Sequence, residues 1–522
     1  MTPPAQHQQQ PPPNMANNVK QPYNHGGWTE DSPGLWSRDC AAGETGVSYN
    51  QNVRDGHTEL TVHLDFTSTI PTNELIQRVR NTWLLCHATH PEVAIEVSTG
   101  TELPQRMSFE TLKSETDAAE WLKETFQVVT SQRAADVTRM TYSRRLPTKG
   151  KRTMLYLVTK GAAYPEETEK HCLVWNFSHT LADIYSVVQW FNYALTTITE
   201  IPGDRDLTVS ELDYSSPGLY DRLPVAPMTP YEEQYKPTAE QKQKAIDGAI
   251  AQGELYAQKM SQSISMHPEP DSPLRTHGTH CIRLQYTLAE SQSLLSALQS
   301  EKLSITFAAA AAVLLAVKQT YGQGHETGAL LGMTRNARRW VSTELKEEGG
   351  YRVPCASDTV FLWIPFQKEW FSPSYSTRDT ILALGRAIRQ ALGPHLTGPH
   401  YLAALSFQAE RFVEGLKKEG EPIPAPQAPG FSPQGALPLQ KHFRSSDGKK
   451  TIEAHDWVHT GRQINPFAWV GMFSLWERVT LSMGFDVKYY EPARMEGFMG
   501  AVKRNLGSVV TRGDKFGVAA KL

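Results

Sequence analysis

Apolar and polar residues alternate along several segments of the chain, and this period of two predicts half-buried β-strands. In residues 60–66, Leu, Val and Phe alternate with Thr, His and Asp. Two uninterrupted apolar runs, at 154–158 and 172–177, are typical of strands that are buried on both faces. We therefore expect strands at 60–66, 154–158, 172–177, 282–286, 358–366 and 473–486.

Other segments have the apolar spacing of an amphipathic helix. Leu75, Val79 and Trp83 share one helical face after the first strand. Thr287 and Glu290 form a capping-box pattern, which predicts the start of a second helix, and an alanine-rich helix is expected at about 304–320. Because a similar order of strands and helices occurs twice, we predict two α/β lobes whose shared cleft is the expected place for a ligand.

Three segments with biased composition define the predicted domains. Residues 1–26 are rich in Pro, Gln and Asn and cannot bury enough apolar surface to offset the entropy of ordering, so a disordered tail is expected. The Pro- and Gly-rich residues 418–450 predict a long surface loop. We expect a disordered tail at 1–26, an N-terminal lobe at 27–215, a crossover linker at 216–275 that is Pro-rich and then helical, and a C-terminal lobe at 276–522.

The composition is ordinary for a globular enzyme and restricts the classes of partner. The 522-residue chain has 39% hydrophobic and 20% charged residues and a net charge of -3. It has no Lys/Arg run that could follow a phosphate backbone, no C-x-x-C pair among its 5 cysteines, and no apolar stretch of the roughly 20 residues that span a bilayer. We therefore expect a cytoplasmic protein with reduced thiols, no membrane span and no nucleic-acid partner.

The strongest candidate for chemistry is the segment 176–183, with the sequence NFSHTLAD. His179 follows a predicted buried strand and precedes an amphipathic helix, so rigid elements hold it on both sides. An imidazole with the ordinary pKa of about 6.5 is mostly neutral at pH 7 and can act as a general base. The alternative is a hydrogen-bonded structural histidine, because the chain has 17 histidines. By spacing alone, Asp183 could orient the imidazole from four residues away.

The spacing of His179 and Asp183 resembles the H-x-x-x-D motif of an acyltransferase superfamily. That superfamily includes the plant BAHD acyltransferases, the condensation domains of non-ribosomal peptide synthetases and fungal secondary-metabolite O-acetyltransferases. Among these, the linker segment 219–237 is most similar to that of fungal trichothecene 15-O-acetyltransferases. Further segments that resemble the superfamily in order and spacing are 67–97, 287–317 and 333–341.

Two departures from the superfamily's patterns narrow the resemblance. The plant enzymes carry a D-F-G-W-G stretch near the C-terminus, and the nearest sequence here, at 483–486, is MGFD. Condensation domains usually have a second His before the motif's His and a Gly after its Asp, where this chain has Ser178 and Ile184. Both departures count against the plant subfamily and against peptide-bond condensation.

The resemblance implies a two-lobe, chloramphenicol-acetyltransferase-like α/β fold with mixed sheets and an active site at the lobe interface. It implies that His179 takes the proton of an acceptor hydroxyl while the oxygen attacks a thioester. It also implies that Asp183 points away from the cleft and pairs with an arginine. The string Asn336-Ala337-Arg338 aligns with the superfamily's Asn-Leu-Arg, so Arg338 is the predicted partner and Arg335 the alternative.

The predicted function is therefore that of an acyl-CoA-dependent O-acyltransferase. We expect it to move an acetyl group from acyl-CoA to a hydroxyl of a small secondary metabolite, with a trichothecene-like sesquiterpenoid as a candidate. Acyl-CoA is a co-substrate, no metal or other cofactor is predicted, and the protein is expected to be a monomer. The alternatives are a condensation-type enzyme that uses a carrier-bound acyl group and a non-catalytic metabolite-binding relative.

Two other patterns are weaker candidates for sites. His455 and His459 could ligate zinc from one helix face, but their neighbours predict a strand, where about 13 Å would separate them on one face. The glycines at 322–328 follow a helix rather than a strand, which predicts a helix end and not a phosphate loop. The aromatic residues Trp469, Phe473 and Trp476 are expected in the core or in the wall of an acceptor pocket.

Overall fold

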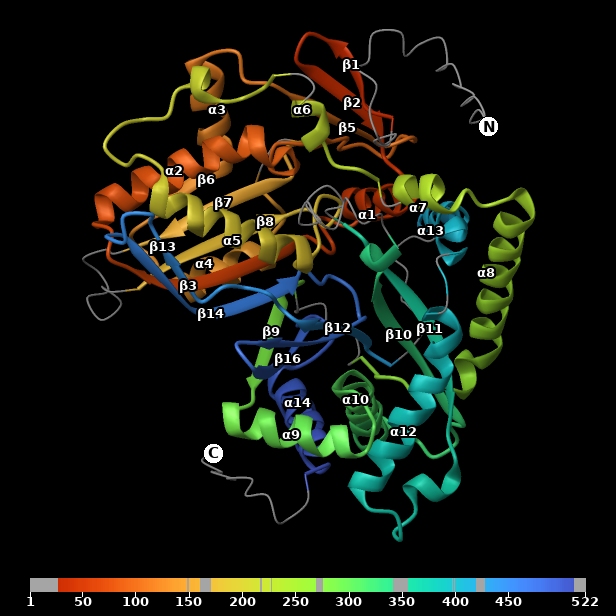
Figure 1. The fold of residues 1–522 in the computed structure, drawn as a ribbon. Helices are drawn as coiled ribbons and strands as arrows, with labels where there is room; N and C mark the ends of the chain where they lie inside the picture. Colours follow the sequence, from red (N-terminus) through yellow and green to blue (C-terminus); the bar gives the residue numbers. More distant parts are fainter. Residues whose placement is uncertain are drawn as a thin grey trace, which may run out of the picture.

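The computed structural model describes residues 27–147, 150–159, 170–215, 218–226, 228–268, 276–340, 355–396, 398, 400–418 and 428–510. The predicted disordered tail, 1–26, lies outside these residues. Two lobes are visible in Figure 1, each built around a six-stranded mixed sheet. The predicted two-lobe α/β architecture is confirmed.

The N-terminal lobe is a mixed sheet with helices on both faces (Figure 1). Alternate residues of β7 explain this arrangement, because Leu155 and Leu157 pack in the cluster that contains α2, α3 and α5, whereas Met154 and Tyr156 pack against α4. The strands predicted at 60–66, 154–158 and 172–177 are confirmed as β3, β7 and β8. The strand order is β13 (His442–Arg444), β14 (Thr451–Gly461), β3 (Leu60–Ser68), β8 (His171–Phe177), β7 (Thr153–Val158) and β6 (Phe126–Val129), and the helices are α2 (Thr72–Thr89), α3 (Glu115–Thr125), α4 (Ala134–Ser143) and α5 (Ile184–Glu200).

The C-terminal lobe packs its sheet on a layer of helices around the predicted alanine-rich helix, α10. The run Ala308 to Ala312 is fully buried, and its small side chains let α12 and α14 approach α10 closely. Thr287 caps α9 as predicted, because its hydroxyl accepts from the Glu290 amide at 3.2 Å. The strand order is β11 (Ser357–Pro365), β10 (Gly328–Asn336), β12 (Gly430–Ala436), β15 (Trp469–Leu475), β16 (Arg478–Asp486) and β9 (Thr279–Gln285), and the helices are α9 (Leu288–Ser300), α10 (Ile305–Tyr321), α12 (Thr377–Leu392) and α14 (Pro492–Gly507).

Two predictions for the C-terminal lobe are wrong. The single strand expected at 473–486 is a hairpin of β15 and β16, which turns at Trp476 and Glu477 with φ angles of 47° and 65°. Tight hairpin turns prefer Gly or Asn at such positions, so these two residues give no turn signal.

The surface loop expected at 418–450 contains β12, which lies in the middle of the sheet and runs parallel to both β10 and β15. Its Gly430 leaves room for a neighbouring ring, because a Cβ there would lie 2.5 Å from Trp469. Phe431 is fully buried in the core of the lobe. The glycine that suggested a loop is therefore needed for packing inside a strand. Residues 419–427 lie outside the described residues.

A strand from the C-terminal part of the chain completes the N-terminal sheet. β14 pairs antiparallel with β3, although the sequence assigns its residues to the lobe at 276–522. Arg283 of β9 in the other lobe forms an ion pair with Asp456 of β14, with an N–O distance of 2.5 Å. The backbone and this ion pair therefore fix the two lobes to each other at one side of their interface.

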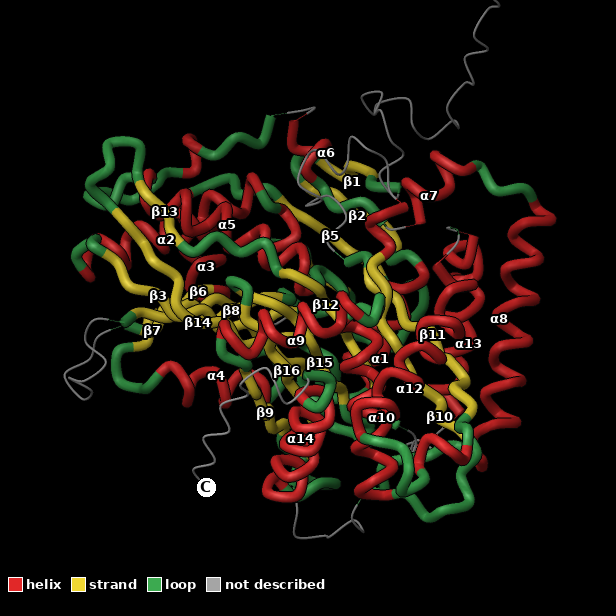
Figure 2. Tube along the Cα trace, turned by 60° about the horizontal axis from the view of Figure 1, so that its bottom comes forward, coloured by secondary structure: helices red, strands yellow, loops and turns green. Residues whose placement is uncertain are grey.

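The predicted crossover linker is helical in its described part. Its long helix, α8, runs along the outer edge of the C-terminal lobe beside β11, as Figures 1 and 2 show. Residues 269–275 lie outside the described residues. No single described helix is long and apolar enough to cross a bilayer, although α9 and α10, which meet at 100°, pass that test together. The linker helices are α6 (Gly218–Arg222), α7 (Met228–Tyr235) and α8 (Ala239–Lys259).

Smaller elements surround the two lobes. A small antiparallel sheet lies beside the N-terminal lobe, and α1 packs against α13 where the lobes meet. The small sheet has the order β1 (Thr29–Ser32), β2 (Leu35–Asp39), β5 (Arg106–Glu110) and β4 (Glu96–Val97). The remaining helices among the described residues are α1 (Ala42–Val53), α13 (Leu405–Lys418) and the short 3-10 turns η2 (Pro91–Val93), η4 (Val209–Glu211), η5 (Met260–Gln262), η6 (Ala337–Trp340), η7 (Lys368–Phe371), η8 (Gly393–Leu396) and η9 (His400–Ala404).

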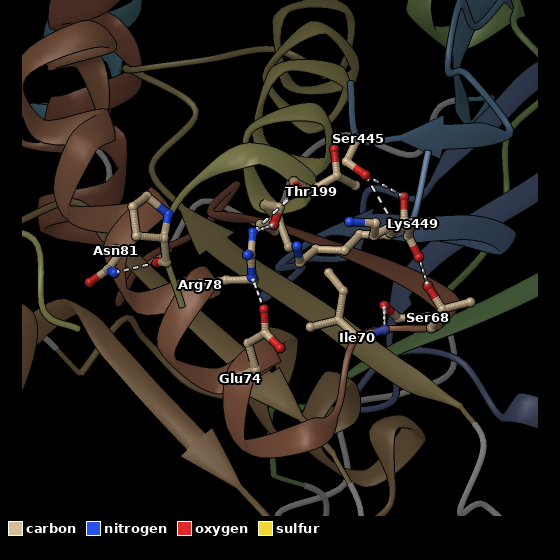
Figure 3. Close-up of polar contacts among 12 residues, drawn as sticks. Ser68, Ile70, Glu74, Arg78, Asn81, Thr199, Ser445 and Lys449 are labelled. Carbon is tan, nitrogen blue, oxygen red and sulfur yellow. Dashed lines mark hydrogen bonds and ion pairs between the residues drawn. The ribbon is translucent and has the colours of Figure 1, made fainter. Parts of the chain in front are cut away.

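A buried arginine anchors the C-terminal end of α5 to α2 (Figure 3). The Arg78 guanidinium donates to the carbonyl oxygens of Ile198 at 3.1 Å and Thr199 at 3.2 Å, and it also donates to the Glu74 carboxylate at 2.8 Å. A positive charge at this end of a helix is favourable because the last carbonyls carry partial negative charge. Fixing α5 here also fixes its other end, which follows the candidate motif.

Candidate active site

His179 lies in the turn between β8 and α5. The Ser178 amide donates to the Arg152 carbonyl at 2.8 Å, and the Ser178 hydroxyl donates to Gln51 Oε1 at 2.5 Å. The same hydroxyl accepts from the Thr180 amide at 3.1 Å. Ser178, where condensation domains usually have a second His, therefore fixes the turn on both sides of the imidazole.

Asp183 is the N-cap residue of α5, and both of its carboxylate oxygens accept hydrogen bonds. Oδ1 accepts from the amides of Tyr185 at 3.1 Å and Ser186 at 3.2 Å. Oδ2 accepts from Arg338 Nη1 at 2.7 Å and from the Ala356 amide at 3.0 Å. The carboxylate thus joins the start of α5 to residues just after β10 and just before β11 in the other lobe.

The structure pairs Asp183 with Arg338, the first of the two arginines that the sequence suggests. Both side chains of this pair are 8% exposed. Arg335 instead forms an ion pair with Asp358 and lies over the ring of Tyr401 at 3.6 Å. Arg335 is still within β10, whereas Arg338 lies in η6, where the chain turns toward the N-terminal lobe.

Burial and the ion pair set the charges of the motif. Burial raises the pKa of Asp183, but the charge and hydrogen bond of Arg338 outweigh it, so the pKa lies below its usual value. Burial lowers the pKa of His179, and the negative charge of Asp183 opposes this shift only in part. Near pH 7 the carboxylate is therefore ionised and the imidazole is neutral.

Cys355 is a neighbour of His179 that the sequence did not reveal. Its Sγ lies 3.7 Å from His179 Nδ1, although 176 positions separate the two residues. Burial raises the pKa of Cys355 to about 12, so the thiol stays protonated and is a poor nucleophile near pH 7. No motif or spacing connects it to the H-x-x-x-D segment, because only the pairing of the lobes brings the two together.

A cavity of about 340 Å³ lies where the lobes meet, and the partly exposed His179 lines it. Its walls come from both lobes, which is the usual place for a ligand site. From the N-terminal sheet and the helices α1, α5 and α13 the lining residues are Val47, Asn50, Thr58, Leu60, His179, Ile184, Phe412, His459, Thr460, Gly461 and Gln463; from the C-terminal sheet and its loops they are Thr334, Cys355, Ser357, Asp358, Thr359, Ser432, Gln434, Trp469, Gly471, Ser482 and Gly484.

More than half of the residues that line the cavity have polar side chains, but almost none of them is charged. Its described lining residues include no Lys, Arg or Glu, and its one carboxylate, Asp358, is paired with Arg335. Asn50 Oδ1, Gln463 Oε1 and Thr58 Oγ1 are buried and have no hydrogen-bond partner among the described residues. These atoms are buried inside the protein and do not face the open space of the cavity, so they do not provide contacts for a bound molecule.

A second cavity, of about 430 Å³, lies between α8 and the loops around η8 and η9. Thr359 lines both cavities, which places the second one next to the first on the β11 side. Lys244 of α8, Arg335 and His395 are among its lining residues. Burial and the charge of Arg335 lower the pKa of His395, so the cationic side chains on this side of the site are Lys244 and Arg335, and Arg335 is paired with Asp358.

The two histidines considered as a zinc pair do not share a face. A register shift between Ala454 and Asp456 makes a bulge, so His455 is exposed while His459 is buried. The bulge has no sequence signal, and it overturns the expectation that a strand would keep both rings on one face.

One group of described side chains, from β3 and β8, has the composition of a metal site. The ligand atoms of His63, Asp65 and Cys172 lie within 4.8 Å of one another. Both ring nitrogens of His63 already have partners, Thr138 Oγ1 and Asp65 Oδ1, each at 2.7 Å. Hydrogen bonds thus account for this group, and the absence of a metal requirement stays a prediction.

Comparisons with known proteins agree with the resemblance seen in the sequence. The acyl-CoA-dependent acyltransferase MAC1 of Pseudozyma antarctica is 32% identical over 527 residues, which cover 90% of this chain and 94% of the relative. The protein of the same name from Mycosarcoma maydis is also 32% identical, and the match covers 90% of this chain and 87% of the relative. No family model matches the chain.

Solved structures share the fold at low sequence identity. The TRI3 trichothecene 15-O-acetyltransferase of Fusarium sporotrichioides superposes with a TM-score of 0.76 at 17% identity, over 93% of this chain and 97% of that structure. The condensation domain of the polyketide synthase MokA gives a TM-score of 0.55 at 12% identity, over 92% and 98% of the two chains. The chain therefore belongs to the family of acyl-CoA-dependent acyltransferases that includes MAC1, and it shares its fold with TRI3 and with condensation domains.

Proposed function

We propose that this protein transfers an acyl group from acyl-CoA to a hydroxyl of a small, neutral metabolite, with His179 as the general base. The observation that carries the proposal is a neutral imidazole that is fixed in a turn and exposed to a cavity between the lobes. The relatives named acyl-CoA-dependent acyltransferases support the choice of donor.

In the proposed reaction, His179 takes the proton of the acceptor hydroxyl while its oxygen attacks the thioester carbonyl. The tetrahedral intermediate then expels the CoA sulfur, which receives the proton from the imidazolium, so an ester and free CoA form. A positioned base contributes about 10²–10⁴-fold to such a rate, and most of the remainder comes from holding both substrates together. CoA is consumed as a co-substrate, and these steps require no metal or prosthetic group.

The cavity chemistry supports a neutral acceptor. An anionic acceptor would bring its charge next to Asp358 without an unpaired cation in the described wall, which favours a neutral acceptor. We propose a secondary-metabolite alcohol and an acetyl donor. A trichothecene alcohol is the candidate that the similarity of the linker, and of the TRI3 fold, favours.

The first test is the release of CoA thiol by purified protein. Acetyl-CoA and decanoyl-CoA are offered with glycerol, glucose, cyclohexanol or a trichothecene with a free 15-hydroxyl, and the ester is identified by mass spectrometry. We expect acceptor-dependent thiol release with at least one pair. A parallel arm offers the same acyl groups on an acyl carrier protein, and turnover in that arm alone would favour the condensation-type alternative.

The lowered pKa of His179 predicts how kcat/KM depends on pH. Because burial holds the pKa of the imidazole below its usual value of about 6.5, the base stays unprotonated as the pH falls through 6.5. We expect kcat/KM to be level around neutral pH and to fall only below pH 6.5. A half-maximal point above pH 7 would contradict this assignment.

Lys244, in the wall of the second cavity, is proposed to attract the phosphates of CoA. Replacing Lys244, which is exposed on α8, with Ala is expected to raise the KM for acyl-CoA about two- to fivefold, the usual effect of one exposed charge pair. The same substitution should not change the KM for acyl-pantetheine, which lacks the nucleotide. Lys242→Ala is the matched control, because Lys242 is bound to Glu232 at 2.7 Å. Equal effects on both donors would contradict the placement.

A further inference from the structure

His459 lines the catalytic cavity from β14 and is not part of the motif. Its side chain is held on two sides. The indole Nε1 of Trp457 donates a hydrogen bond to His459 Nδ1 at 2.9 Å, and the Phe473 ring lies 4.9 Å from the imidazole, centroid to centroid. The residue as a whole is 7% exposed, so the ring has little freedom to turn.

The hydrogen bond from Trp457 determines which nitrogen of His459 carries the proton. An indole N–H can only donate, so Nδ1 is the acceptor and the proton of the neutral ring lies on Nε2. Burial, helped by the positive charge of Arg283, lowers the pKa of His459 to about 3. The ring is therefore neutral near pH 7, and its Nε2–H has no hydrogen-bond partner among the described residues that line the cavity.

The backbone explains why this ring points to the buried side of its strand. The bulge between Ala454 and Asp456 reverses the alternation of β14, so that Trp457 and His459 are buried while His455 is exposed. The ion pair of Asp456 with Arg283 then holds the bulged segment against the other lobe at 2.5 Å. Rigid elements thus position the donor, which is what a recognition residue needs.

The surroundings of His459 suit an oxygen-containing neutral group. Gln463 lines the same wall, but its Oε1 is buried inside the protein rather than exposed to the cavity. Between them, Gly461 and Gly484 carry no side chains, and a Cβ at Gly484 would lie 2.8 Å from Thr460 Oγ1. This part of the wall is therefore closely packed, and the donor that it offers to a hydroxyl or carbonyl oxygen is the Nε2–H of His459.

The order of strands indicates which substrate reaches this wall. The cationic cavity proposed for the CoA nucleotide adjoins β11, at one edge of the C-terminal sheet, whereas Gly484 and Ser482 lie on β16 near the opposite edge. On the basis of the proposed function, we infer that His459 is a positioning residue for the acceptor, and that its Nε2–H donates a hydrogen bond to a neutral oxygen of that molecule.

Two substitutions by amide side chains test the Nε2–H donor of His459 separately from the rest of its ring. In His459→Gln the side-chain amide nitrogen reaches the place of Nε2, whereas in His459→Asn the amide reaches only the place of Nδ1. We expect His459→Asn to raise the KM for the acceptor about tenfold, because one buried hydrogen bond is lost. His459→Gln should stay within about threefold of the wild type. The KM for acyl-CoA should not change in either variant.

Thiol release is measured with acetyl-CoA and the most active alcohol of the panel named above. An unchanged acceptor KM in His459→Asn, with the wild type active, would overturn the role of His459 alone. Equal losses in both variants, or a shared rise in the KM for acyl-CoA, would indicate a structural role and also overturn it. A wild type that releases no thiol with any alcohol would instead overturn the proposed function, and this inference with it.

Discussion

Replacing His179 with Ala is expected to lower kcat/KM for acyl transfer by about 10²–10⁴-fold, the contribution of a positioned general base. The loss should appear in kcat, because the imidazole is one small part of a cavity whose other walls still bind both substrates. The affinity for acyl-CoA, measured by calorimetry, should stay within a few-fold of the wild type. Folding can be followed by the melting temperature, since the ring is partly exposed and its loss leaves only a small gap.

The matched control for this prediction is His455→Ala. His455 is exposed on β14, outside the cavity lining, and should leave kcat and both KM values unchanged. Unchanged turnover in His179→Ala would contradict the proposed transferase activity of His179 and would favour the alternative that the protein only binds metabolites. An additional test is the pH profile of the residual activity, which should lose its acid limb when the base is gone.

Local patterns predicted those parts of the fold that depend on neighbours in the chain. The alternation in 60–66 and the Thr287–Glu290 capping pair are local, and they were sufficient to identify β3 and the start of α9. The failures have a common physical cause. Gly430 is in a strand because the Trp469 ring packs on it, and Trp476 and Glu477 turn a hairpin that the pairing of two strands imposes. Such contacts are absent from any short window of sequence.

Local motifs also predicted part of the candidate site. The H-x-x-x-D spacing pointed to the segment that lines the cavity, and the alignment of Asn336-Ala337-Arg338 pointed to the arginine that reaches Asp183. Cys355 gave no signal, and His459 was singled out only as a candidate zinc ligand, because each meets the site only after strands from distant parts of the chain pair. Nor could the sequence indicate that His459 is neutral, since that depends on its burial and on Arg283.

Replacing Asp183 with Asn is expected to destabilise the folded protein by about 3–5 kcal/mol and to lower kcat. The amide oxygen of Asn can still accept from Tyr185 and Ser186, so the helix cap survives and the change isolates the charge. What is lost is the carboxylate that faces the largely buried Arg338 guanidinium, and breaking one side of a buried pair costs several kcal/mol. Because this pair fixes the turn that holds His179, the imidazole should also be less well positioned.

A double-mutant cycle measured by urea unfolding separates this pair from general damage. The variant Asp183→Asn with Arg338→Met should be more stable than the sum of the two single effects predicts, because neither partner is then left with an uncompensated charge. Glu211→Gln, which breaks the exposed pair with Arg205, serves as the control and should have no measurable effect. Additive effects in the cycle would contradict a coupled Asp183–Arg338 pair.

The pH dependence of unfolding gives an independent measure of the same pair. The pKa of Asp183 is lower in the folded protein than the usual value of about 3.9, so the folded state binds fewer protons at this site than the unfolded chain. Its contribution is complete above pH 3.9 and disappears as the pH falls through the lower, folded-state pKa. The difference in unfolding free energy between the wild type and Asp183→Asn should therefore be constant near neutral pH and shrink only in acid. A difference that shrinks between pH 7 and pH 5 would show that the carboxylate is not held in its charged form by Arg338.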